Sequence, residues 1–118
     1  MNIGQQTLAA ILVAAVPVIG YYVYEQVANQ VTPENAEGVL YVYTSPHCKA
    51  CRMAKPVVDR LVEEGFKIKI IDVRHSPTKA GKANVAFLPT FVHYANGKET
   101  KRIEGTATEQ ELRLMFDP

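Results

Sequence analysis

The sequence predicts an α/β fold in which a βαβ unit is followed by a ββα unit around a central mixed sheet, preceded by one N-terminal transmembrane helix. Three observations lead to this prediction. The first 24 residues carry no charged side chain. Two apolar, β-branched segments flank a segment whose apolar residues recur at helical spacing. Nearer the C-terminus, an Asn-Gly pair joins two further strand-like segments, which is the strongest short-range signal of a β-hairpin.

The size and charge of the chain limit what it can be. Its 118 residues leave room for one folded domain. The 13 Lys and Arg residues nearly balance the 12 Asp and Glu residues, so the composition gives no indication of a nucleic-acid partner. All of these charges lie from Glu25 onward, so the soluble part begins near that residue.

The uncharged N-terminus is predicted to anchor the chain in a membrane. Residues 7–24 are almost entirely apolar, close to the ~20 residues that a spanning helix needs. Tyr21, Tyr22 and Tyr24 gather at one end, as aromatic residues do at a membrane interface. A cleaved signal peptide is one alternative, although no Lys or Arg precedes the segment. A buried core helix is another, although the rest of the chain is too small to surround it.

We therefore divide the chain into a membrane anchor at 1–24, a linker at 25–38 and a folded domain at 39–118. The positive-inside rule says little about the orientation of the segment in the membrane, because no Lys or Arg closely flanks it. The acidic residues that follow the segment, beginning with Glu25, favour a cytoplasmic N-terminus. We expect a single-pass membrane protein with its domain on the exported, periplasmic or extracytoplasmic side.

The first half of the domain reads as strand, helix and strand. Residues 39–44 are β-branched and aromatic, without charge, and predict a buried strand that ends in the turn 45–47. A helix follows from Cys48 to Glu64, with Pro56 inside it as a kink. Its predicted buried face consists of Met53, Ala54, Val57, Val58, Leu61 and Val62. The second strand, over 66–72, should run parallel to the first.

The second half reads as loop, hairpin and helix. Residues 74–84 are polar and predict a loop with one or two helical turns. Strands are predicted at 89–94 and 98–103, joined by Asn96-Gly97. Thr108 and Glu111 have the spacing of a capping box and predict a short helix that reaches Phe116.

The two cysteines of the chain, Cys48 and Cys51, are separated by two residues at the strand-to-helix junction. This spacing indicates a dithiol redox site. A cysteine at a helix N-terminus faces free backbone N–H groups and the positive end of the helix dipole, which favour the reactive thiolate. Our hypothesis is that Cys48 attacks and Cys51 resolves. Lys49, Arg52 and a protonated His47 would lower the pKa of Cys48 further.

In this order of elements, with this motif, the chain resembles the thioredoxin family over about 39–116. The segment from Cys51 to Pro56 resembles the active-site helix of the family, including its proline. Leu88-Pro89-Thr90 resembles the segment whose cis proline faces the disulfide, and the hairpin and final helix follow in the family's order. The first strand and helix of full thioredoxins have no counterpart, so the domain looks minimal.

The resemblance implies a thiol-disulfide oxidoreductase that exchanges disulfides with protein substrates and with a thiol reductant or oxidant. Leu88, Pro89 and Thr90, with His47, would bind substrate next to Cys48. No cofactor is expected beyond the Cys48–Cys51 disulfide, and no metal. The family's buried aspartate below the second cysteine is replaced here by Val42, so the proton of Cys51 must leave by another route.

Several alternatives stay open at this point. A disulfide oxidase or isomerase of exported proteins would use the same site with another potential. A copper- or metal-binding module without redox catalysis would use His47, Cys48 and Cys51 as soft ligands. A non-catalytic anchor would hold a partner, and the cysteines could form an inert disulfide. His75 and His93 are expected to be structural or exposed, and Met53 to belong to the core.

Overall fold

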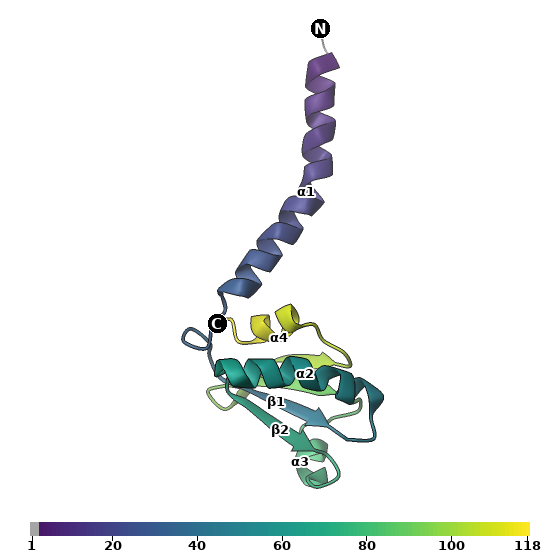
Figure 1. Ribbon diagram of the computed structural model, residues 1–118, viewed down its shortest axis with the longest axis vertical. Coiled ribbons are helices and arrows are strands. Elements are labelled where there is room, and N and C mark those ends of the chain that lie inside the picture. The colour runs from purple at the N-terminus through teal and green to yellow at the C-terminus, as the bar shows by residue number, and fades with distance from the viewer. Residues whose placement is uncertain (1–2) are drawn as a thin grey trace.

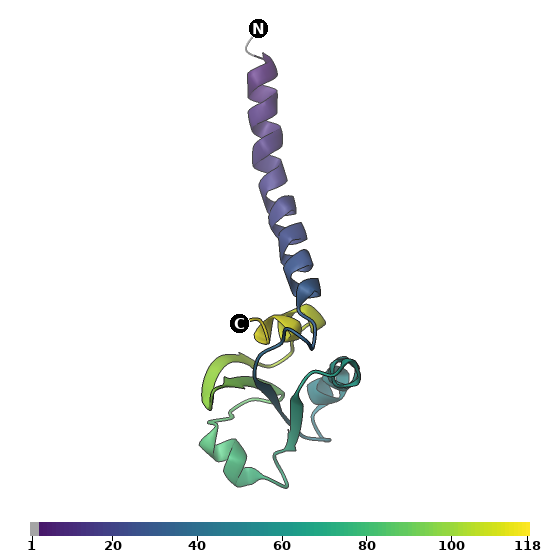
Figure 2. The same cartoon turned by 90° about the vertical axis from the view of Figure 1, so that its left-hand side faces the viewer.

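The computed structural model describes residues 3–118, with side chains from residue 17 onward. A four-stranded sheet in the order β2-β1-β3-β4 forms the centre of the domain (Figure 1). The elements are α1 (Ile3–Gln30), β1 (Val39–Thr44), α2 (Lys49–Glu64), β2 (Ile68–Asp72), α3 (Pro77–Lys82), β3 (Thr90–Ala95), β4 (Lys98–Glu104) and α4 (Glu109–Met115). Helix α1 projects away from the domain in both side views (Figures 1 and 2), which makes the molecule 71 Å long.

The sheet is mixed, as predicted. β1 pairs in parallel with β2, and antiparallel pairs join β1 to β3 and β3 to β4. The turn between β3 and β4 has positive φ at both Asn96 and Gly97, which confirms the predicted hairpin. β2 begins later than predicted, because the amide of Phe66 donates to Leu61 at the end of α2 and its ring packs on Phe116.

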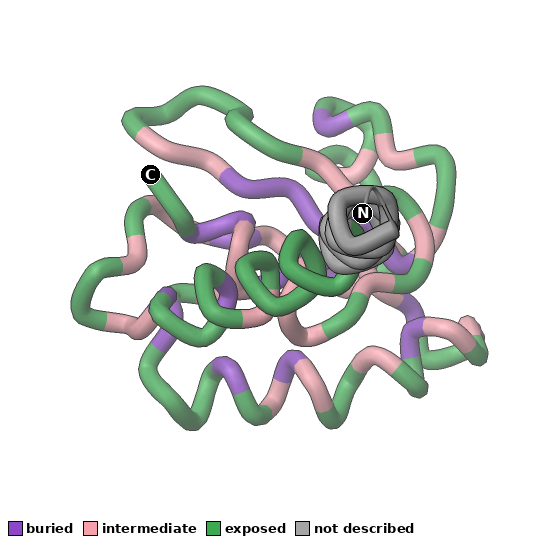
Figure 3. Tube along the Cα trace, turned by 90° about the horizontal axis from the view of Figure 1, so that it is seen from above, coloured by how far each residue is buried: buried purple, intermediate pink, exposed green. Residues whose placement is uncertain are grey.

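One face of the sheet carries the main core. Leu40, Val42 and Phe91 point from the strands towards α2 and α4. They meet Leu61 and Phe116, which are fully buried. Figure 3 shows the buried positions of α2 recurring on the side of the helix that faces the sheet. The predicted capping box of α4 is present, with Thr108 and Glu111 each bonding the other's backbone.

The buried face of α2 is narrower than the sequence predicts. Met53, expected in the core, is 67% exposed, and Val62 is 44% exposed. The buried residues of the helix are Cys51, Val58 and Leu61. Each residue turns the helix by about 100°. A residue next to a buried one in the sequence therefore points away from the buried face.

Helix α1 continues into the segment predicted as a linker. It ends at Gln30, and both Ala28 and Val31 are buried against the domain. Arg113 of α4 adds a hydrogen bond to the carbonyl of Val31. These contacts make this part of 25–38 a packed segment rather than a free tether.

The predicted membrane anchor falls mainly on residues 1–16, whose side chains lie outside the described part. Among the residues that the structure describes, no helix has the length and apolar character to cross a membrane.

The start of β1 depends on a glycine that no other residue can replace. Gly38 has φ +78°, and a Cβ there would overlap the Tyr94 carbonyl and come within 2.7 Å of the His93 ring. We predict that Gly38→Ala lowers the free energy of unfolding by at least about 2 kcal/mol. The measurement is denaturant unfolding, with Gly81→Ala as the control. Gly81 lies in α3 with open space around it, so a comparable loss there would contradict this explanation.

Candidate active site

Cys48 and Cys51 lie at the N-terminus of α2, where the strand-turn-helix pattern places them. Cys48 is the N-cap residue, and its sulfur accepts a hydrogen bond from the backbone amide of Cys51 at 3.2 Å. Cys48 is half-buried, whereas Cys51 is only 5% exposed. The two thiols therefore differ in access, and only Cys48 can meet a large substrate first.

The pKa of the Cys48 thiol lies below its usual range. The largest cause is the hydrogen bond between the two cysteine side chains, which stabilises the Cys48 thiolate. Backbone N–H groups of Cys51 and Ala50 and the charge of Arg52 act in the same direction, against some desolvation. These are the helix N-terminal groups that the sequence predicts.

The pKa of the Cys51 thiol is raised, chiefly by burial and then by its hydrogen bond to Cys48. Hydrogen bonds from Thr44 and from the Ser45 backbone only partly offset this. Cys48 is thus the more acidic thiol, and Cys51 holds its proton. This asymmetry matches an attacking and a resolving cysteine.

A second segment, far away in the sequence, faces Cys48. The Leu88–Pro89 peptide bond is cis, as the resemblance implies. The Leu88 carbonyl lies 3.5 Å from the Cys48 sulfur. Thr90 is buried and its hydroxyl donates to the Phe87 carbonyl, while the Pro89 carbonyl accepts from Gly105. These bonds fix the backbone beside the thiol, where the sequence predicts substrate to bind.

His47 is held from one side by residues that the sequence analysis missed. Arg74 lies 3.2 Å from Nε2 of His47 and forms an ion pair with Asp72 at 3.0 Å. Because a guanidinium can only donate, Nε2 of His47 is the acceptor in this contact. The hydrogen bond from Arg74 lowers the pKa of Asp72 to about 2, so the pair stays charged.

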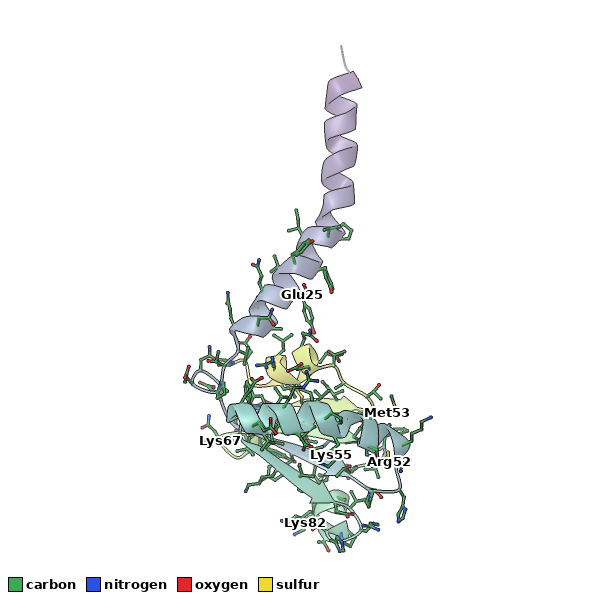
Figure 4. All side chains as sticks on the ribbon, in the orientation of Figure 1. Glu25, Arg52, Met53, Lys55, Lys67 and Lys82 are labelled. Carbon is green, nitrogen blue, oxygen red and sulfur yellow. The ribbon has the colours of Figure 1, made fainter. Side chains whose placement is uncertain are left out.

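The other predicted residues lie close by but differ in what they contact. Arg52 donates to the Pro46 carbonyl at 2.9 Å, which keeps its charge near the turn. Lys49 is exposed on the first residue of α2, and Pro56 lies inside that helix. Figure 4 shows Arg52 and Met53 at the N-terminal end of α2.

A cavity of about 290 Å³ lies beside Cys51. Val42 lines it, at the position where the resemblance implies an aspartate. The carboxylate that reaches this cavity is Asp72, at the end of the neighbouring strand. Asp72 lies opposite Thr44 in the parallel pair of β1 and β2, which explains its position. The predicted parallel pairing of these two strands is the sequence signal that could have revealed this carboxylate.

In the part of the chain that the structure describes, no three His, Cys, Asp or Glu side chains are grouped so as to hold a metal ion. Of the other histidines, His93 is buried and bonds Thr100 and the Glu37 carbonyl, which is a structural role. His75 is largely exposed.

Comparison with known proteins agrees with this geometry. The family model for thioredoxin matches residues 13–117. Thioredoxin from Bacillus subtilis is 33% identical over 88 residues, covering 71% of this chain and 85% of the relative. Chloroplastic thioredoxin M4 from Arabidopsis thaliana is 30% identical over 82 residues, or 67% of this chain, but the chain spans only 42% of that relative. Among solved structures, a single-site mutant of thioredoxin from Halobacterium salinarum superimposes with a TM-score of 0.63 at 30% identity, covering 73% of this chain and 76% of that one.

The thiol of Cys51 should be a measurable cause of the acidity of Cys48. We predict that Cys51→Ala raises the pKa of Cys48 and that Cys51→Ser changes it less, because the serine hydroxyl can still donate to the sulfur. The measurement is the pH dependence of alkylation by iodoacetamide, with the midpoint of Cys51→Ala at the higher pH. A midpoint of Cys51→Ala equal to that of Cys48 in the unaltered chain would show that the Cys51 thiol does not contribute to the acidity.

Proposed function

We propose that the chain exchanges disulfides with protein substrates through Cys48 and Cys51. The premise is that it belongs to the thioredoxin family and is a thiol-disulfide oxidoreductase. The observation that carries this proposal is the asymmetry of the two thiols. Cys48 is accessible with a lowered pKa, and Cys51 is buried with a raised pKa.

The exchange proceeds in two steps that balance in atoms and electrons. The Cys48 thiolate attacks one sulfur of a substrate disulfide, and the other substrate sulfur leaves as a thiolate that takes a proton from solvent. Cys51 then loses its proton and attacks the Cys48 sulfur, which releases the second substrate thiol. The substrate has gained two electrons, and the protein is left with a Cys48–Cys51 disulfide, which an external thiol reductant must reduce.

The cis-proline segment supports a protein substrate rather than a small thiol. Leu88, Pro89 and Thr90 present backbone beside Cys48, and the Pro89 carbonyl is already used by Gly105. A substrate segment that pairs briefly with Leu88 would align its disulfide with the Cys48 sulfur. His47, fixed by Arg74, would form the opposite side of this site.

The proton of Cys51 leaves without a buried acid next to it. Val42 cannot accept a proton, and Asp72 is a weak base because Arg74 holds it ionised. We propose that water in the cavity beside Cys51 takes the proton. This makes the resolving step slower than it would be with a carboxylate at position 42.

A disulfide oxidase is the second candidate, and the lowered pKa of Cys48 favours it, because a stable thiolate makes the disulfide more oxidising. A redox titration of the full chain in detergent separates the two functions. We expect a potential nearer the ~−270 mV of reductases than the ~−120 mV of strong oxidases. A value at the oxidising end would assign the chain to oxidation of its substrates.

Mixed-disulfide trapping tests the roles of the cysteines. We expect Cys51→Ser to accumulate a covalent complex with a disulfide-bonded protein such as insulin, because the attacking thiol remains while the resolving thiol is lost. Cys48→Ser should trap little, since Cys51 is buried. The measurement is non-reducing electrophoresis, and equal trapping by both variants would contradict the assignment.

We further propose that residues 7–24 tether the domain to a membrane, with the domain on the exported side. The support comes from the uncharged sequence 1–24 and from the large apolar residues that α1 exposes before it reaches the domain. These are Val18, Ile19, Tyr21, Tyr22, Val23 and Tyr24, each at least 41% exposed. Such a surface is unfavourable in water and suits lipid.

A charge within the apolar segment tests the tether. We predict that Ala15→Arg releases the chain from membranes into the carbonate-soluble fraction, because an arginine in the middle of a spanning helix costs about 3 kcal/mol. Asn2→Arg, which lies outside the segment, is the control and should stay with the membrane pellet. If the unaltered chain is itself extracted by carbonate, the tether does not exist.

A further inference from the structure

The face of the sheet opposite α2 and α4 is only partly covered. Helix α3 has 6 residues, and Ala80 and Ala83 pack against Tyr43 and Ile71 at one end of this face. Figure 2 shows α2 and α3 on opposite sides of the sheet. Between α3, the start of β1 and the β3–β4 turn remains a hollow of about 580 Å³, twice the volume of the cavity beside Cys51.

Three tyrosines form the floor of this hollow. Tyr41 and Tyr94 meet edge to face with ring centroids 5.0 Å apart, and Tyr43 stacks on Tyr41 at 6.5 Å. Tyr43 is buried, while Tyr41 and Tyr94 are half-exposed. Rigid aromatic side chains in a concave surface are the commonest anchors of protein recognition, because they bury much area and lose little entropy.

The rim of the hollow is positively charged. Lys79 and Lys82, in the last turn of α3, line it and are exposed. The amino group of Lys69 lies 5.6 Å from the centre of the Tyr41 ring on the same face. Among the described residues that line the hollow there is no Asp or Glu.

Two carboxylates of β4 are already paired with another cation. Glu99 and Glu104 form ion pairs with Arg102 at 2.6 and 4.0 Å. Arg102 also donates to the Ala83 carbonyl at 2.7 Å, so it is held at the edge of α3. The hollow therefore combines an aromatic floor with an uncompensated positive rim.

We propose that this hollow is a docking site for an acidic peptide segment of a partner protein. One apolar side chain of the segment would lie among the rings of Tyr41, Tyr43 and Tyr94, and its carboxylates would pair with Lys79 and Lys82. Gly97 lines the hollow and has open space where a side chain would lie, which leaves room for a peptide backbone. The concave shape favours a peptide over a flat anionic membrane surface.

Docking at this place leaves the thiols free. The hollow lies on the face of the sheet opposite α2, whereas Cys48 lies at the N-terminus of α2. A bound partner would therefore be held on one face of the sheet while disulfide exchange takes place beside the helix on the other, raising the effective concentration of its disulfide. The binding itself does not depend on the proposed redox function, and its test needs no active cysteine.

The test is a fluorescence-anisotropy titration of the full chain in detergent with a labelled eight-residue peptide of six glutamates, one leucine and one phenylalanine. We expect saturable binding that weakens about three- to tenfold in Lys82→Glu, the range expected when one rim ion pair becomes a repulsion. Lys55→Glu is the matched control, because it makes the same charge change at an exposed lysine of α2, which covers the opposite face of the sheet (Figure 4). It should leave the affinity within about twofold, because the sheet separates this lysine from the hollow.

Four results would overturn the proposal. The first is no saturation up to millimolar peptide, and the second is equal weakening by Lys55→Glu. The third is that vesicles of one-third phosphatidylserine, but not the peptide, bind with a dependence on Lys82. The fourth is self-association of the chain that Lys82→Glu abolishes, which would make a second copy the occupant.

Discussion

The hydrogen bond from the Cys51 amide to the Cys48 sulfur links the start of helix α2 to the acidity of the Cys48 thiol. It caps the first turn of α2, with Cys48 as the N-cap residue. The Cys51 thiol contributes most to the lowered pKa of Cys48, and this bond and the Ala50 amide of the first turn act in the same direction. The residue that caps the helix is also the proposed nucleophile, and the acidity of Cys48 depends on the helix that places Cys51 beside it.

The main core determines how different the two thiols become. Cys51 is on the buried face of α2, one turn after Cys48, and burial raises its pKa. Val42 adds an apolar surface beside it instead of an acid. The difference between the thiols is therefore a consequence of packing. The ionised carboxylate of Asp72 at the rim leaves it intact, because Arg74 already compensates its charge.

The two faces of the sheet serve different purposes. The face under α2 and α4 is closed by fully buried residues such as Phe91 and Phe116, and it fixes the thiols and the cis-proline segment relative to each other. The opposite face is covered only by the short α3, and its tyrosines stay partly open to solvent. A minimal domain thus keeps the part of the fold that positions the dithiol and leaves the other face available for binding.

The sequence by itself determined the elements whose signals are local. The strand 39–44, the helix start at Cys48, the Asn96-Gly97 turn and the Thr108 capping box each depend on residues within a few positions, and each is present. Tertiary structure alone decided which side chains meet across the sheet. The contact of Arg74 with His47, the burial of Val31 and the exposure of Met53 depend on how elements pack, and no local periodicity encodes the relative position of two segments that are far apart in the chain.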